Sequence, residues 1–326
     1  MKIYGTLGPS CSDCNTLSDM ICAGMNGIRL NLSHGMLESF GRYIDELRIA
    51  EKACNTTVEM VIDMEGPELR VGNLPEALPL NVGDTVMLGR DIPLKDIVLE
   101  QLDVGMICRL DDGKIELEII SKNNDGFLCS VLRDGKLLPR KSFAVLGHSV
   151  KVPLLTENDI KNIAYAKNVG VSAILQPFVR CADDVRIVKK MLAELGCEGV
   201  EVIAKIEDKT GLDNAAGIIE AADRVLFARG DLGNSMDMWL LPKYQKIIAQ
   251  KCTAANKSLI IATQLLASME NNPVPTRAEM NDIYNSVLDG ADGLMLTGET
   301  AAGKYPVQAI KYLKNAADQA LMSNTL

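Results

Sequence analysis

Residues 58–70 read VEMVIDMEGPELR. The first part, 58–63, is a short apolar run that ends in a carboxylate. Such a run predicts a buried strand of a parallel sheet. Seven similar runs alternate along the chain with segments of helical periodicity. They cover residues 2–7, 27–32, 173–178, 200–206, 224–228, 258–263 and 293–297.

Eight such strands with helices between them predict an α/β fold, a closed (β/α)8 TIM barrel. An open doubly wound sheet is the alternative, but the glycine-rich dinucleotide fingerprint is absent from the sequence. The gap between residues 63 and 173 is far too long for one helical crossover. Within it, glycine and proline punctuate short alternating segments. We therefore expect a barrel formed by residues 1–70 and 152–326, interrupted by a small β-rich lid domain at residues 71–151.

The composition excludes several classes of protein. The chain has 326 residues, 34 basic against 43 acidic, without a long block of one sign, so we expect no nucleic-acid partner. Nine scattered cysteines indicate reduced thiols, and Cys11-x-x-Cys14 lacks the second ligand pair of a zinc site. No apolar stretch reaches the length of a membrane span, and no signal segment precedes the first strand. These features predict a soluble, cytoplasmic protein without a membrane partner.

Polar side chains gather where the second and third strands end. Arg29, Asn31 and Ser33 alternate with leucines, so all three can share one face of a strand. Asp63 ends the neighbouring strand. Asn31, Ser33 and Asp63 together offer the oxygen ligands that a hard metal ion prefers. The alternative for each residue is an ordinary hydrogen bond between a strand end and a loop.

The fifth and sixth strands end in a lysine and two carboxylates. Lys205 and Glu207 fall on one face in AKIED, and Asp231 follows Gly230 in ARGDLG. Two carboxylates on neighbouring strands can hold Mg²⁺ or Mn²⁺ and leave positions for substrate oxygens. Gly230 would let a substrate approach the backbone closely. A structural ion pair between Lys205 and Glu207 is the alternative.

The last two strands end in hydroxyl groups. Thr263 stands where a barrel presents catalytic groups, although such a threonine is more often a helix N-cap. Thr297, Glu299 and Thr300 could cap a helix or contact a ligand. We expect Arg277, in the loop-like PTRAE segment, to form a structural salt bridge.

Eight segments, taken in order, resemble the pyruvate kinase family. They are TLGPS, GMNGIRLNLSHG, DMEGPELR, IAKIED, ARGDLG, ATQLLASM, PTRAE and MLTGETAAGKYP. The resemblance runs through nearly the whole chain, and it implies an interrupted barrel with a mobile lid. It also implies an enzyme that transfers the phosphoryl group of phosphoenolpyruvate to ADP, giving pyruvate and ATP, with a protonation of the enolate as the second step.

The resemblance also implies roles for single residues at the phosphoryl group. Arg29 and Lys205 match the catalytic groups that bind and neutralise it. Thr263 matches a residue beside the substrate carboxylate and the protonated carbon, and Gly230 and Asp231 match substrate-binding positions. Asp231 also matches a ligand of the divalent cation, Mg²⁺ or Mn²⁺.

Further matches concern the cations and the nucleotide. Glu207 matches the second ligand of the divalent cation. The potassium site is matched by Asn31, Ser33, Asp63 and the Met64 carbonyl, and Glu68 resembles the variant found in potassium-dependent members. The positions near the nucleotide are those of Arg70, His34 and Lys141.

Four departures from the family pattern stand out. Glu65 replaces a lysine and reverses a charge beside the expected cation site. Pro177 replaces a serine, and Asn234-Ser235 stand where a glutamate is expected. The segment after the lid, residues 140–146, reads RKSFAVL in place of a lysine-glycine signature. The family's C-terminal domain, which binds sugar-phosphate effectors, has no counterpart in the sequence, so we expect no allosteric control of that kind.

Three hypotheses follow for the function. The first is an active, unregulated pyruvate kinase. The second is a related barrel enzyme that acts on another enol phosphate or keto acid, as the altered residues could indicate. The third is a non-catalytic paralogue that binds phosphoenolpyruvate. In each case contacts between barrels could form a homo-oligomer.

Overall fold

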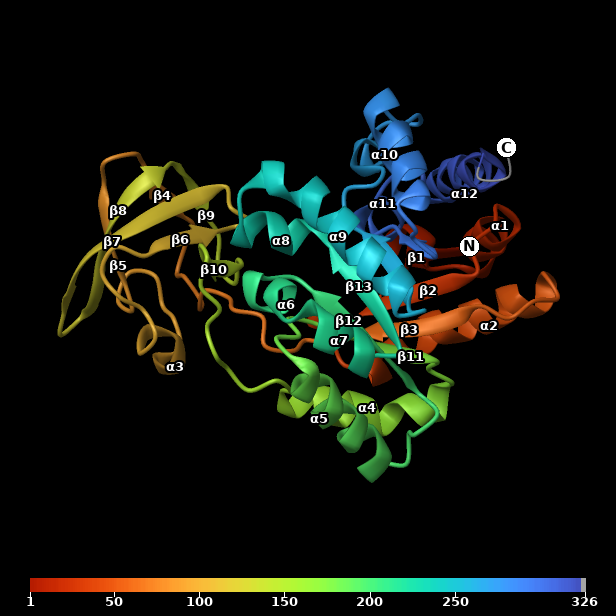
Figure 1. Ribbon diagram of the computed structural model, residues 1–326, viewed down its shortest axis with the longest axis horizontal. Coiled ribbons are helices and arrows are strands. Elements are labelled where there is room, and N and C mark those ends of the chain that lie inside the picture. The colour runs from red at the N-terminus through yellow and green to blue at the C-terminus, as the bar shows by residue number, and fades with distance from the viewer. Residues whose placement is uncertain (324–326) are drawn as a thin grey trace.

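A computed structural model describes residues 1–323, except for the side chain of His34. Eight parallel strands close into a barrel in the order β1-β15-β14-β13-β12-β11-β3-β2 (Figure 1). The predicted α/β barrel is therefore confirmed, and each strand begins and ends within two residues of its predicted run. The strands are β1 Lys2–Thr6, β2 Gly27–Asn31, β3 Glu59–Asp63, β11 Ala173–Gln176, β12 Glu201–Ile206, β13 Arg224–Ala228, β14 Ser258–Ala262 and β15 Gly293–Met295.

Helices surround this barrel and bury its outer face. The longer ones are α1 Cys14–Cys22, α2 Gly41–Ala53, α4 Glu157–Val169, α5 Ala182–Glu194, α9 Leu241–Ala254, α10 Arg277–Leu288 and α12 Pro306–Ser323. Shorter helices are α6 Lys209–Asp213, α7 Ala215–Ala221, α8 Arg229–Ser235 and α11 Gly298–Ala301. Single 3-10 turns are η1 Pro9–Cys11, η2 Leu32–His34, η3 Leu37–Phe40, η4 Met238–Leu240 and η5 Ala267–Glu270. No helix within residues 1–323 is both long enough and apolar enough to cross a membrane.

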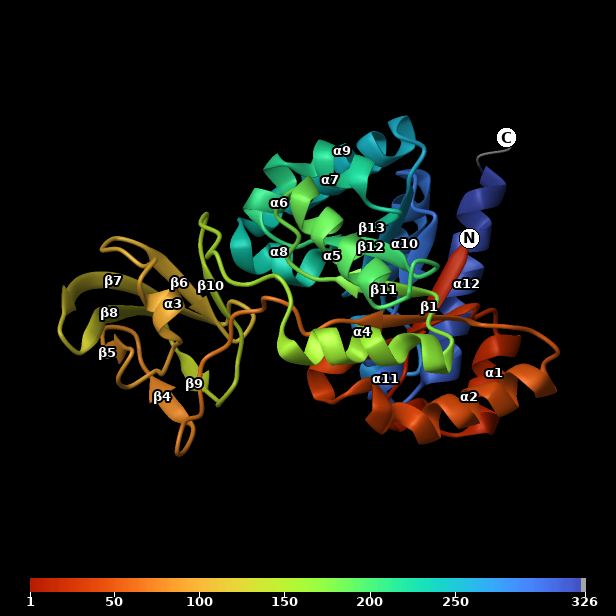
Figure 2. The ribbon, with the colours of Figure 1, turned by 90° about the horizontal axis from the view of Figure 1, so that it is seen from below.

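A second body of antiparallel strands lies between β3 and β11. Its main sheet has the order β10-β6-β7-β8-β5, and β4 pairs with β9 beside it. Figures 1 and 2 show it to one side of the barrel, connected to it by two extended segments. It has an apolar core of its own, built on residues such as Leu117 and Phe127, and we call it the lid. Its elements are β4 Leu78–Leu80, β5 Thr85–Leu88, α3 Asp96–Leu99, β6 Ile107–Leu110, β7 Ile115–Asn123, β8 Gly126–Arg133, β9 Gly135–Leu137 and β10 Phe143–Val145.

The chain re-enters the barrel through a capped helix. Thr156 and Asp159 form a reciprocal capping box at the start of α4, and Gly170 ends that helix with a φ of 75°. The carboxylate of Asp159 also accepts hydrogen bonds from the backbone amides of Glu65 and Gly66, at 2.9 and 3.0 Å. One buried carboxylate therefore ties the start of the segment that leaves the barrel to the segment that returns to it.

A polar network closes the end of the barrel where the strands begin. The buried phenol of Tyr4 donates to Glu59 at 3.0 Å and accepts a hydrogen bond from Arg224 at 2.7 Å. Arg224 also pairs with Glu59 and, at 2.7 Å, with Glu201, while Lys2 lies 2.9 Å from Glu59. Burial alone would raise the pKa of Glu59, but Arg224 and Lys2 outweigh it and hold that pKa below the usual value.

We predict that Glu59→Gln lowers the free energy of unfolding by about 3 kcal/mol at pH 7, because Arg224 then loses its buried counter-charge. Since the folded-state pKa of Glu59 is lowered, its stabilisation is present above the unfolded-state pKa and is lost as the pH falls through the folded-state value. Urea unfolding at several pH values measures both effects. The control Glu201→Gln alters a half-exposed partner and should cost less than about 1 kcal/mol. Equal costs for the two variants would contradict this account.

Candidate functional site

The carboxylate of Asp63, buried at the end of β3, holds two cationic side chains. Arg29 Nε and Nη2 lie 2.8 and 2.7 Å from Asp63 Oδ2. Lys205 Nζ lies 3.2 Å from both oxygens of the same carboxylate. Strand register explains the meeting, because Asp63 pairs with Leu175 of β11, and Leu175 pairs with Ile203 of β12, two residues before Lys205. The barrel thus places a guanidinium and an ammonium side by side at the carboxyl ends of its strands.

Lys205 also forms an ion pair with Glu207. The ammonium lies 2.9 Å from Glu207 Oε1, without the angle of an aligned hydrogen bond, while Oε2 accepts a bond from the Phe178 amide at 2.8 Å. Burial would lower the pKa of Lys205, but Asp63, Glu207 and Asp231 outweigh it and raise that pKa. The neighbouring carboxylates therefore favour the charged ammonium of Lys205, whose side chain is only 13% exposed.

Burial opposes the charged forms of the two carboxylates nearest this cluster, Glu207 and Asp231. Burial raises the pKa of Glu207 despite Lys205, and the charges of Asp231 and Asp63 raise it further. Burial also raises the pKa of Asp231, and the nearby carboxylate of Glu68 adds to that shift. A divalent cation bound to these two carboxylates would offset that cost and favour their charged forms. No group of three His, Cys, Asp or Glu side chains in residues 1–323 could surround an ion, so water or substrate oxygens would complete its shell.

Thr263 follows β14 with a left-handed backbone, at a φ of +72°. Its hydroxyl accepts a hydrogen bond from the Gly230 amide at 2.8 Å and lies 2.6 Å from the Ala262 carbonyl. No helix starts at this residue, since the next turn is η5 at Ala267–Glu270, so the N-cap alternative is wrong. A β-branched residue is strained in this conformation, and such strain is typical of functional sites.

The hydrogen bond from Gly230 joins Thr263 to α8. This short helix carries Gly230 and Asp231 in its first turn, directly after β13. Arg229 fixes the same junction, because its guanidinium donates to the Thr263 carbonyl at 2.8 Å and pairs with Asp282 of α10 at 2.7 Å. The three residues predicted to bind substrate, Gly230, Asp231 and Thr263, therefore lie together.

A cleft of about 530 Å³ opens between these residues and the lid. Its barrel wall includes Gly230, Asp231 and Thr263, and its lid wall includes Arg109 and Arg133. Sequence reasoning missed both lid arginines. They could have been predicted from the sequence as basic residues on lid strands that lie beside the Asp111-Asp112-Gly113 turn.

Four oxygen-bearing residues were predicted to hold potassium, and the structure brings two of them side by side. Asn31 pairs with Asp63 in the register of β2 and β3, and Met64 follows directly. Asn31 Oδ1 accepts a hydrogen bond from the amide of Ser33, at 3.3 Å, and the Ser33 side chain is exposed. The Asp63 carboxylate is already shared by Arg29 and Lys205.

Glu65 reverses a family charge, but its side chain turns toward the N-terminus of α4. Glu65 Oε2 accepts hydrogen bonds from Thr156 at 3.4 Å and Asn158 at 3.3 Å. A carboxylate is stabilised at a helix N-terminus by the free amides there. Pro177, in place of the family serine, packs on Gly66, whose φ is +57°; a Cβ on Gly66 would lie 2.2 Å from the proline ring. Both departures therefore have structural partners.

The structure does not bring the residues predicted to bind nucleotide together in one cavity. Arg70 is exposed and lines a cavity of about 950 Å³, where it lies 2.8 Å from Glu68 and donates to the Arg140 carbonyl at 2.9 Å. Lys141 does not line this cavity, and it pairs with Asp111 inside the lid at 2.8 Å. The side chain of His34 lies outside the described residues.

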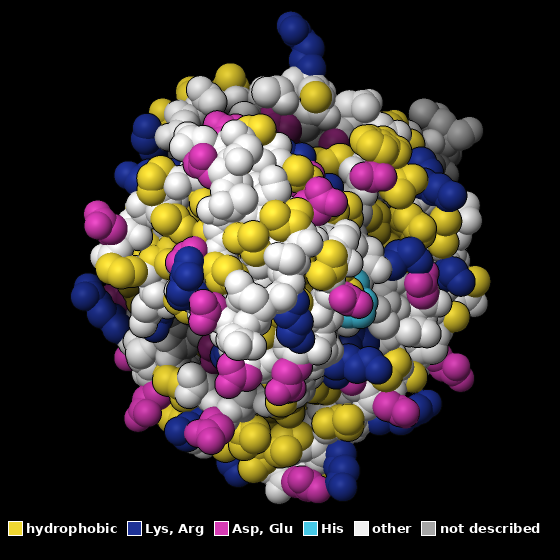
Figure 3. Space-filling view, turned by 90° about the vertical axis from the view of Figure 1, so that its left-hand side faces the viewer, with side chains coloured by type: hydrophobic (Ala, Val, Ile, Leu, Met, Phe, Trp, Pro, Cys, Tyr) yellow, Lys and Arg dark blue, Asp and Glu magenta, His cyan; other side chains and the backbone are white. Residues whose placement is uncertain are grey.

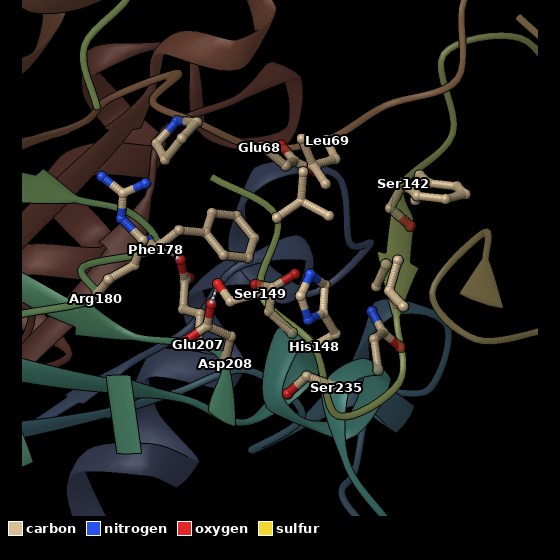
Figure 4. A pocket seen from close by; sticks show the side chains of 17 residues that line it. Glu68, Leu69, Ser142, His148, Ser149, Phe178, Arg180, Glu207, Asp208 and Ser235 are labelled. Carbon is tan, nitrogen blue, oxygen red and sulfur yellow. Dashed lines mark hydrogen bonds between the residues drawn. The ribbon is translucent and has the colours of Figure 1, made fainter. Parts of the chain in front are cut away.

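A smaller pocket, of about 60 Å³, lies where the segment leaving the lid crosses the barrel (Figure 4). Glu207, Phe178 and His148 point into it, and Ser149 donates a hydrogen bond to Asp208. The outer end of the lid has Lys, Arg, Asp and Glu side chains interspersed among apolar ones, with no field of a single sign (Figure 3). The ligand-sized spaces that reach the predicted site residues are therefore at the junction of lid and barrel.

Residues 297–300 and the PTRAE segment, residues 275–279, form structural hydrogen bonds. Thr300 accepts a hydrogen bond from the Thr6 amide at 2.7 Å, and Glu299 accepts one from the Thr297 amide at 2.7 Å. The bond between Thr6 and Thr300 ties the last βα unit to the first, and that between Thr297 and Glu299 is local to the start of α11. The prediction of a salt bridge for Arg277 is wrong, because this exposed residue has no acidic partner within residues 1–323. Glu279 instead caps α10 together with Thr276.

We predict that Thr263→Val lowers the free energy of unfolding by about 1–2 kcal/mol, because the Gly230 amide loses its acceptor. Thr263→Ser keeps the hydroxyl and should stay within about 0.5 kcal/mol of the wild type. Urea unfolding compares the free energies, and hydrogen exchange at the Gly230 amide should be faster only in the valine variant. Protection of that amide in Thr263→Val would contradict the assigned bond.

Comparisons with known proteins agree with this geometry. The family model described as pyruvate kinase, barrel domain, matches residues 1–310. A pyruvate kinase of Aeropyrum pernix is 39% identical to this chain, and the match covers 98% of this chain and 70% of the relative. A pyruvate kinase of Geobacillus stearothermophilus is 38% identical, and the match covers 97% of this chain and 56% of the relative. The crystal structure of a pyruvate kinase from Cryptosporidium parvum superposes with a TM-score of 0.91, at 32% identity, over 98% of this chain and 69% of that one. The chain thus spans between about half and two thirds of the length of such relatives. It belongs to the pyruvate kinase family.

Proposed function

We propose that the protein transfers the phosphoryl group of phosphoenolpyruvate to ADP, forming pyruvate and ATP. The observation that carries the proposal is the buried ammonium of Lys205, held between Asp63 and Glu207 and next to Arg29. Phosphoryl transfer passes through a loose, anionic transition state, which needs fixed positive charge more than covalent help. A charge that is already in place costs no reorganisation during the reaction.

In this proposal each group at the carboxyl end of the barrel has one task. Arg29 and Lys205 bind the phosphoryl group and offset its charge as it moves. Gly230 and Asp231 bind the substrate together with Thr263, whose hydroxyl lies at the cleft wall close to Gly230. Thr263 would stand beside the substrate carboxylate and the carbon that is protonated when the enolate becomes pyruvate.

We further propose two cations. Glu207 and Asp231 would hold Mg²⁺ or Mn²⁺, since burial and the neighbouring carboxylates raise their pKa values and a bound cation would offset the cost of ionising them. Asn31, Ser33, Asp63 and the Met64 carbonyl would hold K⁺, and Glu68 belongs with that arrangement. Such ions supply positive charge to the transferring group.

The nucleotide would occupy the 950 Å³ cavity that Arg70 and Ser33 line. Arg70 can reach phosphate oxygens if it leaves Glu68, and the family resemblance assigns His34 to the nucleotide as well. Lys141 could contribute only by giving up its ion pair with Asp111. We place the protein in the cytoplasm, where its nine free thiols would stay reduced, and propose that any homo-oligomer forms through barrel contacts.

The direct test is an assay of the purified protein with phosphoenolpyruvate, ADP, Mg²⁺ and K⁺, with a known pyruvate kinase as positive control. Pyruvate formation at ordinary enzyme efficiency supports the proposal. Weak turnover alongside strong turnover of another enol phosphate or keto acid would overturn it in favour of a related barrel enzyme. Metal-dependent binding of phosphoenolpyruvate in calorimetry, without turnover, would indicate a non-catalytic paralogue.

We predict that Lys205→Met lowers kcat by about 100-fold or more, because the transferring group loses a fixed positive charge. Methionine fills a similar volume, but Asp63 and Glu207 lose a buried counter-charge, so the variant should be folded yet less stable. Circular dichroism and thermal unfolding verify the fold. Lys189→Met is the matched control: it removes a lysine that pairs with Asp223 on the outside of the barrel. Undiminished turnover in Lys205→Met, or an equal loss in both variants, would contradict the assigned role.

A further inference from the structure

One arginine of the lid reaches across to the barrel. Arg109 lies on β6, is 12% exposed, and directs its guanidinium at the end of helix α8. Its Nη1 lies 3.3 Å from the carbonyl oxygen of Gly233, 3.2 Å from that of Asn234 and 3.1 Å from that of Met236. A single charged donor therefore serves three backbone acceptors of the barrel.

A carboxylate on the next lid strand orients this guanidinium. Glu116 faces Arg109 directly in the register of β6 and β7, and its Oε2 accepts a bond from Arg109 Nε at 3.0 Å. Arg133 of β8 approaches the same carboxylate, at 3.4 Å, but it donates its other hydrogen bond to the Gly113 carbonyl inside the lid. Arg109 and Arg133 thus share an anchor and line the same cleft, while only Arg109 bonds to the barrel.

The acceptors are those that a helix leaves free. The last carbonyls of a helix lack partners within it and carry its partial negative charge, so a cation bound there is favourable. A hydrogen bond to a charged donor is also about twice as strong as one between neutral groups. The contact between Arg109 and α8 is therefore a stable one, as long as Glu116 keeps the guanidinium oriented.

The end of α8 is also where the sequence departs from the family. Asn234 and Ser235 stand where the family resemblance leads one to expect a glutamate, and both are largely buried under the lid. The lid makes a second backbone contact here, because the Gly147 amide donates to the Ser235 carbonyl at 3.4 Å. The departure thus coincides with the surface on which the lid rests.

Helix α8 connects this contact with the candidate site. Its seven residues begin at Arg229, and its first turn carries Gly230 and Asp231, which line the cleft. The Gly230 amide is bound by Thr263 at one end, and Arg109 binds the carbonyls at the other. A helix this short moves as one piece, so a change at its last turn also reaches its first.

We propose that Arg109 is a positioning residue that latches the lid onto α8, and that it thereby fixes Gly230 and Asp231 and closes the cleft to water. It contacts no reacting atom in this scheme. Closed sites strengthen the electrostatic interactions inside them, and a displacement of the metal and substrate positions is costly. The effect on turnover rests on the function proposed above, whereas the latch itself can be measured without any substrate.

The first test is hydrogen exchange on the intact protein and two variants. Arg109→Leu should speed exchange about tenfold or more at the Gly147 amide and in the last turn of α8, because a charge-assisted bond is lost. Arg133→Leu, the matched control, should leave those amides as in the wild type. Unchanged exchange in β7 and β8 verifies that the lid is still folded. Equal protection of α8 and Gly147 in wild type and Arg109→Leu would overturn the proposal.

The single tryptophan of the chain gives a second readout. Trp239 is 77% exposed, lines the cleft and lies three residues beyond Met236, so its fluorescence should change when the lid leaves α8. The spectrum should shift in Arg109→Leu and be partly restored in Arg109→Lys, since an ammonium can bind carbonyls but cannot also engage Glu116 as a fork.

Kinetics separate the latch from the function itself. If the wild type turns over phosphoenolpyruvate, Arg109→Leu should lower kcat and raise KM, and Arg109→Lys should recover part of both losses. A normal kcat and KM in Arg109→Leu would overturn the proposed effect on the site. If the wild type is inactive, the proposed function fails, and the exchange experiment still decides whether the latch exists.

Discussion

The carboxylate of Asp63 is the interaction on which the site depends. It lies at the end of a barrel strand, out of water, and it carries the guanidinium of Arg29 and the ammonium of Lys205. Two buried cations would repel each other without it, and a buried carboxylate without them would be costly. Glu207 extends the cluster on the far side of Lys205 and ties it to the Phe178 amide. The result is a fixed pattern of charge whose positive face can meet a phosphoryl group.

The barrel supplies this pattern and the lid encloses it. Parallel strands in register bring Asp63 and Lys205 together from positions far apart in the sequence. The lid leaves the barrel after β3, just beyond Asp63, and the buried Asp159 ties its departure to the start of α4. The cleft and the nucleotide-sized cavity both lie between these two bodies. Contacts between lid and barrel, such as that of Arg109, therefore bear on the site as directly as residues within it.

Strand ends were the part of the site that sequence could predict. Period-two alternation and the polar residue that ends each run place Arg29, Asp63, Lys205, Glu207 and Asp231 at one end of the barrel, and the structure has them there. The N-cap reading of Thr263 failed because the backbone turns left-handed after β14, and its hydroxyl takes a tertiary partner, the Gly230 amide. No local pattern encodes such a contact.

Side-chain direction outside the barrel was harder to predict. The charge of Glu65 looked adverse beside a cation site, yet its side chain turns to the N-terminus of α4, which is remote in sequence. Lys141 was expected near the nucleotide, but Asp111 of the lid holds it. The contact of Arg109 with the barrel was not predictable from the sequence, since its acceptors are backbone carbonyls more than a hundred residues away. In each case the deciding partner is brought by the fold.

We propose that a divalent cation binds Glu207 and Asp231 and offsets the cost of keeping these buried carboxylates charged. Electron paramagnetic resonance of Mn²⁺ titrated into the protein tests it most directly. The account predicts one Mn²⁺ bound per chain, and an affinity about tenfold or more lower in Glu207→Gln. The absence of bound Mn²⁺ in the wild type, or equal affinity in the two proteins, would contradict it.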